Sequence, residues 1–318
     1  MAFSPELPFF AELDRARVIL LAGAGGGADV FAALPLYFAL RRAGKEVHLA
    51  SLSFATIFDS TAKVLGPALV RVTAATEASA SYFPELHLAR WLATRGEEVP
   101  VYCFERTGAL PIAAAYRTLA GIVAPDAVVL VDGGTDILMR GDEAGLGTPE
   151  EDVASLAAVH ALDVPLKLVA CIGFGIDAYH GVSHAHVLQA VAELSRGGDF
   201  LGAWSLLKEM PEARLYREAV ESAFGGASRQ PSVVNASIFS ALDGEYGDVH
   251  ATRRTQGSEL FINPLMSLYW TFRLDAVARR NLYLDRIRDT ASNFALRLEI
   301  ERFRHELPEV RPRQPLPM

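Results

Sequence analysis

The feature that most constrains the fold is a regular alternation between short apolar runs and longer stretches of helical periodicity. We expect six of the apolar runs to be strands, and several are too continuously apolar to keep one face in water. These runs are residues 17–23, 46–54, 68–74, 101–105, 127–134 and 166–175. The alternation predicts an α/β fold: a Rossmann-like, mostly parallel, doubly wound sheet with helices on both faces.

Three of the stretches between these runs carry clear helix signals. In the first, Pro35 should lie in the first turns or bend the helix. Thr148 and Ser183 precede the other two and are expected to be their N-caps. The three predicted helices are residues 29–44, 148–162 and 183–198.

The last third of the chain is less regular. We expect a Rossmann-like domain at 1–266 and a helical C-terminal extension with a Pro-rich tail at 267–318. Within the first domain, the pattern predicts a helical insertion around 197–230, strands at 232–244 and 258–266, and between these strands a polar loop suited to be a lid.

Composition and charge narrow the class of partner. The chain has 318 residues and a net charge of −8, which argues against nucleic acid as the main partner because that affinity depends on a basic surface. No stretch resembles a signal peptide or reaches the roughly 20 apolar residues that a bilayer helix needs. We therefore expect a cytoplasmic protein with a small-molecule substrate and no membrane partner, its Cys103 and Cys171 buried as thiols. The C-terminal helices are a candidate contact for a homo-oligomer.

The first candidate site is the glycine-rich turn after residues 17–23. It matches the relaxed dinucleotide fingerprint, with Ala28 in the third position, and glycines there let a backbone approach an anion. No acid follows the second strand run to hold a ribose, so an NAD site is not favoured. The alternatives are a cradle for another anionic ligand and a purely structural turn with Asp29 as a helix cap. The residues concerned are Gly23, Gly25, Gly26, Gly27 and Asp29.

The second candidate site follows the strand run 127–134, at the edge where ligands bind in parallel sheets. Asp132 and Asp136 are candidate general acids or bases, and Arg140 is a candidate partner for a carboxylate or phosphate. Asp142 and Glu143 are alternative ligands for a hard cation such as Mg²⁺. The structural alternative is a solvated acidic loop with Arg140 paired to its own acids. The remaining binding candidates here are Gly133, Gly134 and Thr135.

The third candidate site follows the strand run 166–175. Gly173 and Gly175 end the run, and Asp177 repeats the arrangement of strand, glycine and aspartate found at Asp132. His180 is a candidate general acid or base, with a surface histidine as the alternative. The spacing of His180, His184 and His186 does not complete a zinc motif, so we predict no transition-metal site. Weaker candidates at the rim are Glu105, Arg106, Arg253, Arg254 and Asn263.

Three blocks, in this order, resemble DUF1152, a family of archaeal and bacterial proteins built on a domain of unknown function. They are GAGGGADVFAALPLYFALRRAGKEVHLASLSF, VLVDGGTDILMRGDEAGLGTPEEDVAS and GFGIDAYHGVSHAHVLQAVAEL. The chain departs from the family pattern at Ala28, and again after Asp177, where GIDAYHGVS replaces the usual Gly-x-Asp-Gly-Glu-Leu. The resemblance implies a Rossmann-like fold with a site at the strand ends, and it implies no particular reaction.

Together these features predict an enzyme that acts on a polar, anionic or nucleotide-like metabolite by carboxylate acid–base chemistry, of hydrolase or lyase type. The predicted catalytic residues are Asp132, Asp136, Asp177 and His180. The alternatives are a nucleotide-dependent oxidoreductase and a ligand-binding or sensing protein without turnover.

Overall fold

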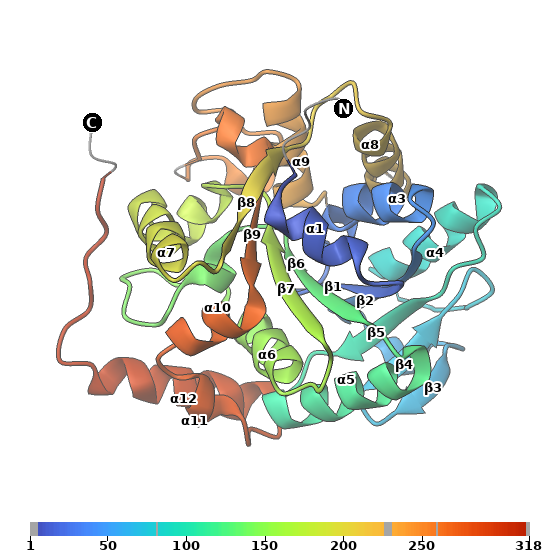
Figure 1. Ribbon diagram of the computed structural model, residues 1–318, viewed down its shortest axis with the longest axis horizontal. Coiled ribbons are helices and arrows are strands. Elements are labelled where there is room, and N and C mark those ends of the chain that lie inside the picture. Colours follow the sequence, from blue (N-terminus) through green and yellow to red (C-terminus); the bar gives the residue numbers. More distant parts are fainter. Residues whose placement is uncertain (1–5, 81, 226–230, 259, 316–318) are drawn as a thin grey trace.

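The computed structural model describes residues 6–80, 82–225, 231–258 and 260–315. The described strands form one nine-stranded sheet in the order β3-β4-β5-β2-β1-β6-β7-β9-β8 (Figure 1). Its centre is parallel and consists of β5 (Val101–Glu105), β2 (Glu46–Ser53), β1 (Val18–Gly23), β6 (Ala127–Asp132) and β7 (Leu166–Cys171). The chain runs outward from β1 in both directions, so the topological switch point lies between β1 and β6. The predicted α/β, Rossmann-like class is confirmed.

Antiparallel strands extend this parallel centre on both edges. β4 (Leu69–Val72) pairs with β5, and β3 (Lys63–Gly66) pairs with β4. On the other edge, β9 (Leu268–Arg273) pairs with β7, and β8 (Phe200–Ser205) pairs with β9.

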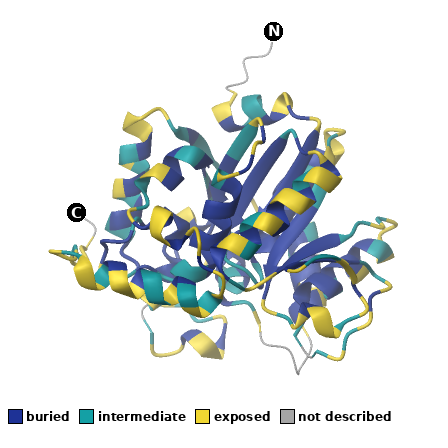
Figure 2. Cartoon of the chain, turned by 90° about the horizontal axis from the view of Figure 1, so that it is seen from below, coloured by how far each residue is buried: buried dark blue, intermediate teal, exposed yellow. Residues whose placement is uncertain are grey.

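Helices cover both faces because the central strands bury side chains on both sides. Along β1, Leu20 and Ala22 belong to one apolar cluster, whereas Ile19 and Leu21 belong to the other. Figure 2 shows the helices exposed on their outer surfaces and buried toward the sheet. One layer contains α5 (Ala109–Val123), α6 (Pro149–His160), α7 (His184–Arg196), α10 (Leu274–Arg280), α11 (Leu284–Ile287) and α12 (Asn293–Glu306). The other contains α1 (Pro8–Asp14), α2 (Asp29–Ala32), α3 (Leu34–Arg42), α4 (Pro84–Thr94), α8 (Pro211–Phe224) and α9 (Val233–Leu242).

The sequence-based prediction fails at the antiparallel edge that β8 and β9 form. The expected helical insertion around 197–230 contains β8 before α8, and the expected helical extension begins with β9. Tyr269 and Phe272 of β9 are fully buried, because the strand lies between β7 and β8. The boundary expected at residue 266 therefore falls just before a strand of the main sheet.

Two further predicted strands are wrong. Residues 232–244 contain helix α9, whose cap is Ser232: its side chain accepts a hydrogen bond from the Asn235 N–H. The described residues of 258–266 form no strand, and Ile262 makes only an isolated bridge to Gly247. Pro264 follows there and begins a 3₁₀ turn, η5 (Pro264–Ser267), because proline cannot donate to a ladder.

The predicted helices are present with local differences. The helix expected at 29–44 is divided into α2 and α3, with the break directly before the Leu34-Pro35 pair. Thr148 and Ser183 occupy N-cap positions, but neither side chain caps its helix. The Thr148 hydroxyl instead donates to Asp136, and the Ser183 hydroxyl donates to the Gln314 carbonyl.

Cys103 and Cys171 are buried free thiols, as expected. Among the described helices, none has the length and apolar character that crossing a membrane requires.

Candidate functional site

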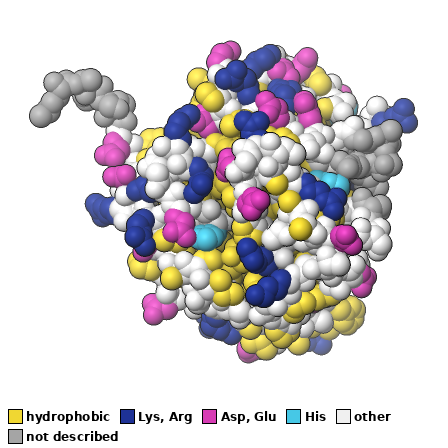
Figure 3. All heavy atoms as spheres, turned by 90° about the vertical axis from the view of Figure 1, so that its right-hand side faces the viewer, with side chains coloured by type: hydrophobic (Ala, Val, Ile, Leu, Met, Phe, Trp, Pro, Cys, Tyr) yellow, Lys and Arg dark blue, Asp and Glu magenta, His cyan; other side chains and the backbone are white. Residues whose placement is uncertain are grey.

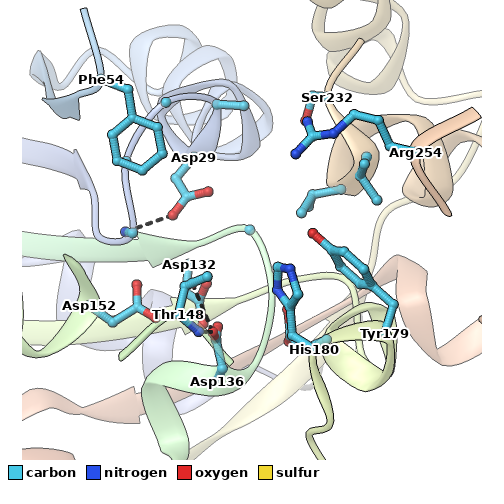
Figure 4. Close-up of a pocket in the computed structure, with 18 of the residues that line it drawn as sticks. Asp29, Phe54, Asp132, Asp136, Thr148, Asp152, Tyr179, His180, Ser232 and Arg254 are labelled. Carbon is cyan, nitrogen blue, oxygen red and sulfur yellow. Dashed lines mark hydrogen bonds between the residues drawn. The ribbon is translucent and has the colours of Figure 1, made fainter. Parts of the chain in front are cut away.

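A cavity of about 400 Å³ opens at the switch point, beyond the carboxyl ends of β1 and β6. Its walls come from segments far apart in the chain: the glycine turn 25–27, the loops after β2, β6 and β7, the first turns of α6 and α9, and the late polar loop. Figure 4 shows aspartates from several of these segments pointing into the same space. This is the position where open α/β sheets bind ligands.

Five aspartates line this cavity, and we call them the pocket acids. Each side chain is at most 8% exposed. Asp29 begins α2, Asp132 ends β6, and Asp152 lies in the first turn of α6. The other two lie in short 3₁₀ turns: Asp136 begins η2 (Asp136–Leu138), and Asp177 is the second residue of η3 (Ile176–His180).

Glycines allow these acids to converge. A Cβ atom on Gly25 would lie 2.5 Å from Asp152 Oδ1 and 2.8 Å from Asp29 Oδ2. A Cβ atom on Gly133 would lie 2.8 Å from Asp29 Oδ1, and one on Gly147 would overlap the Asp136 carboxyl. The glycines of these loops thus leave room for carboxylates, a role that sequence analysis did not assign to them.

Four of the pocket acids accept hydrogen bonds from the backbone. The Gly25 N–H donates to Asp29 (2.7 Å), the Thr135 N–H to Asp177 (2.8 Å), the Thr148 N–H to Asp136 (2.7 Å) and the Ile137 N–H to Asp132 (3.3 Å). Asp152 is different, because both of its carboxylate oxygens are buried without a hydrogen-bond donor in the described part of the chain. Its polar neighbour is the carboxyl of Asp136.

Burial and mutual repulsion raise the pKa values of the pocket acids. Burial is the largest cause, and the charges of neighbouring aspartates add to it. The pKa values of Asp132, Asp152 and Asp177 lie well above the ordinary range, and the pKa of Asp29 rises to about 7. Arg254 is the single Lys or Arg among the described residues that line the cavity. The described lining therefore gathers five carboxyl groups around one cationic side chain, and their raised pKa values show that the cavity opposes their ionisation.

The opposite wall carries aromatic and basic groups. Arg254 comes from η4 (Arg253–Thr255) in the late polar loop and faces the cavity near Tyr179 and His180 (Figure 4). The rings of Tyr179 and His180 lie 3.8 Å apart, and burial lowers the pKa of His180, which favours its neutral form. Phe54, which follows β2, lies against the glycine turn.

Three residues expected in the site lie elsewhere. Arg140 donates to Asp142 from both its Nε (2.9 Å) and a terminal nitrogen (2.6 Å). This arginine is therefore paired with an acid of its own loop, which was the structural alternative in the sequence analysis. Arg311 also donates to Asp142 (2.8 Å) and to Glu143 (2.7 Å). We call Arg140, Asp142, Glu143 and Arg311 the arginine-paired cluster. Its acids already have cationic partners, so they are not Mg²⁺ ligands in this arrangement.

The glycine turn does not offer all its N–H groups to an anion. The Gly25 N–H donates to Asp29, and the Gly27 N–H donates to the Leu52 carbonyl. The following helix α2 has only four residues. An anionic ligand at this turn would have to compete with a carboxylate of the chain, which removes the main argument for an anion cradle.

The remaining predicted binding residues support the site rather than line it. Gly23 ends β1 against α2, and Gly134 lies beside the Asp177 carboxyl. Thr135 donates to Asp177 through its N–H. Gly173 and Gly175 adopt φ values of +101° and +91° in the turn after β7, where other residues would be strained.

Sequence analysis missed several lining residues, chiefly Asp152, Thr148, Tyr82 and Tyr179. Asp152 lies in the acidic first turn of α6, and acids at that position suit a helix N-terminus whether or not they belong to a site. The order of the elements could have identified Asp152. A helix that follows a parallel strand begins at the carboxyl edge of the sheet, where the cavity lies, and Asp152 is in the first turn of such a helix. Tyr82 carried no such signal, since it reaches the cavity from the segment before α4.

The fold and the site together define the class: a Rossmann-like α/β protein with an acidic pocket at the switch point of its sheet. The chain belongs to the family described as protein of unknown function DUF1152, whose model matches residues 20–303. This span contains all five pocket acids and Arg254. No curated protein and no solved structure matches the chain.

Proposed function

We propose that this protein is an enzyme that acts on a small polar metabolite by carboxylate acid–base chemistry, in a hydrolytic or elimination step. The observation that carries the proposal is the convergence of five buried aspartates from several segments of the chain in one cavity of about 400 Å³. Buried, unneutralised carboxyl groups are costly for a fold, so their concentration at a ligand-binding edge favours a functional explanation over a structural one.

Asp177 and His180 are the best placed groups for proton transfer. They lie on the same 3₁₀ turn after β7, and both line the cavity. One oxygen of Asp177 accepts from Thr135, which fixes the carboxyl group in position. A positioned acid or base of this kind contributes about 10²–10⁴-fold to a reaction rate.

The nucleotide-like branch of the proposal rests on Phe54. A second cavity of about 400 Å³ adjoins the same ring and is lined by residues 53–59, Glu105 and Arg106. Phe54 and Phe58 are 45% and 40% exposed, and the Arg106 guanidinium lies 5.3 Å from the centre of the Phe54 ring. The exposed Phe54 ring would offer an aromatic base a stacking surface beside the pocket acids.

The test is a turnover screen of the purified protein against sugar phosphates, acidic sugars, and nucleosides with and without phosphates, followed by NMR. Asp177→Asn should lower turnover of any substrate found by about 100-fold or more. The variant amide oxygen can still accept the Thr135 hydrogen bond, so the fold should be kept.

The matched control is Asp163→Asn. Asp163 is exposed between α6 and β7, at the opposite end of the parallel strands, and its replacement should leave turnover unchanged. Binding of a compound without turnover would contradict the proposal in favour of a ligand-sensing protein. Equal turnover by the wild type and Asp177→Asn would remove the assigned role of Asp177.

A further inference from the structure

We propose that Asp29, Asp132 and Asp152 together bind one hard divalent cation of the Mg²⁺ or Ca²⁺ type. Each of the three offers a carboxylate oxygen, and these oxygens all lie within 4.8 Å of one another. All three side chains are buried, at 8%, 2% and 3% exposure. The inference concerns the cavity described above and adds a ligand that its carboxyl groups alone would hold.

The span of the three oxygens fits a single ion. Two ligand oxygens on opposite sides of a cation are separated by twice the metal–oxygen distance, about 4.2 Å for Mg²⁺ and about 4.8 Å for Ca²⁺. A separation of up to 4.8 Å fits Ca²⁺ as the carboxylates stand, whereas Mg²⁺ requires the oxygens to move slightly closer together. Gly25 makes this approach feasible, because any side chain there would occupy the space of Asp29 and Asp152.

Asp152 provides the independent observation. Both of its oxygens are buried without a hydrogen-bond donor among the described residues, although the side chain points into the cavity. A buried carboxylate without a donor or counter-ion is strongly unfavourable. A cation bound between Asp152, Asp29 and Asp132 would satisfy these oxygens and relieve the repulsion among the three.

The other two pocket acids each accept two hydrogen bonds from a threonine. Asp136 accepts two hydrogen bonds from Thr148, and Asp177 accepts two from Thr135. Asp132 accepts one hydrogen bond, from the Ile137 N–H at 3.3 Å, and Asp29 accepts from the backbone of Gly25 and of Gly133. Asp152 and Asp132 are thus the pocket acids with the fewest hydrogen bonds among the described residues. An all-oxygen ligand set favours Mg²⁺, Ca²⁺ or Mn²⁺ over zinc.

A cation here would also change which substrates the cavity accepts. The described lining offers an anionic group of a substrate one cationic side chain, Arg254, beside five carboxyl groups. A bound divalent ion supplies the positive charge that such a group needs. This consequence, unlike the ion site itself, rests on the proposed function.

The test uses Mn²⁺ as the probe, measured by electron paramagnetic resonance on the full chain without any substrate. The wild type should bind one Mn²⁺, and Mg²⁺ or Ca²⁺ should displace it. Loss of a group that merely supports a metal ligand costs about 10–100-fold in affinity, so Asp152→Asn, which removes a direct ligand, should weaken binding by at least that. Asp163→Asn should bind as the wild type does.

A melting curve in chelator supplies the second readout. Asp152→Asn should melt at or above the wild-type temperature, because it removes a repelled charge, and added Mg²⁺ or Ca²⁺ should shift it less. Asp132→Asn repeats the test at a second ligand. The inference is overturned if the wild type binds none of the three ions, or if both variants keep wild-type affinity.

These outcomes are separate from those of the turnover screen. Ion binding without turnover would support the cation site and contradict the proposed enzymatic function. Turnover without ion binding would support the enzymatic function and contradict the cation site.

Discussion

Two acidic clusters arise from one glycine-rich segment, and their surroundings differ completely. Asp132 and Asp136 enter the cavity, whereas Asp142 and Glu143 lie in the arginine-paired cluster. Burial raises the pKa of the pocket acids. Burial acts in the same direction on Asp142, but hydrogen bonds from Arg140 and Arg311 hold its pKa below the ordinary value.

The difference distinguishes acids that hold two parts of the fold together from acids that gather in a cavity without cationic partners. Acids paired with arginines hold the C-terminal segment onto the loop, since Arg311 also forms a backbone bridge with Glu143. Burying a carboxyl group without a cationic partner is unfavourable, and a ligand that pairs with the group reduces this cost. The face of the molecule in Figure 3 shows a third situation, with acidic and basic side chains interspersed in solvent.

The largest expected effect comes from breaking the arginine-paired cluster. Arg311→Ala should lower the free energy of unfolding by about 3 kcal/mol, because Glu143 is only 1% exposed and loses a cationic partner. Urea unfolding followed by circular dichroism measures the change.

Arg302→Ala is the control, since its ion pair with Glu299 is exposed at the arginine and should cost less than about 1 kcal/mol. The pKa of Asp142 is lowered on folding, so its contribution is present above its ordinary pKa of 3.8 and is lost as pH falls below it. The stability gap between the wild type and Arg311→Ala should therefore narrow under acid conditions. A gap that is independent of pH would contradict this account.

Glu85 of α4 lies outside both acidic clusters, so it tests the effect of burial alone on the pKa of a carboxyl group. It is fully buried, accepts a hydrogen bond from Ser51 (2.9 Å), and burial raises its pKa from 4.5 to about 7. As pH rises from 4.5 to about 7, the unfolded chain releases this proton while the folded chain keeps it, so stability should fall. Glu85→Gln should remove this fall and gain about 2 kcal/mol at pH 8 relative to the wild type.

Melting temperatures measured across this pH range test the prediction. Glu98→Gln, at an exposed position, should follow the wild-type curve. If the melting temperature of Glu85→Gln changed with pH in the same way as that of the wild type, Glu85 would not titrate as described.

The smallest effect is expected at the edge of the pocket. Thr148→Val removes the hydroxyl that donates to Asp136 (3.1 Å) but keeps the backbone N–H that donates to the same oxygen. The loss should be about 1 kcal/mol, measured by thermal unfolding. Thr118 is an exposed helical threonine whose hydroxyl donates to the Ala114 carbonyl, and Thr118→Val should change stability by less than about 0.5 kcal/mol. A more stable Thr148→Val would show that Asp136 does not need this donor.

The sequence alone determined the parallel centre of the fold and the edge where the site lies. Runs such as 127–132 are apolar on both faces, which only a covered parallel strand explains. Asp132, Asp136, Asp177 and His180 were found because a polar residue directly after such a strand must lie at its carboxyl end. These conclusions need only local periodicity and the geometry of parallel strands.

Only the tertiary structure decided which loop residues share the cavity. Asp136 and Asp142 are the same residue type and lie only six positions apart in the sequence. Arg311, far along the chain, pairs with Asp142, whereas Asp136 lines the cavity and accepts hydrogen bonds from Thr148. Strands β8 and β9 were missed for the same reason, because their antiparallel pairing joins segments that are distant in sequence. Local pattern fixes an element and the edge to which it delivers a side chain, whereas long-range packing decides whether that side chain meets a counter-charge, a hydrogen-bond donor or an open cavity.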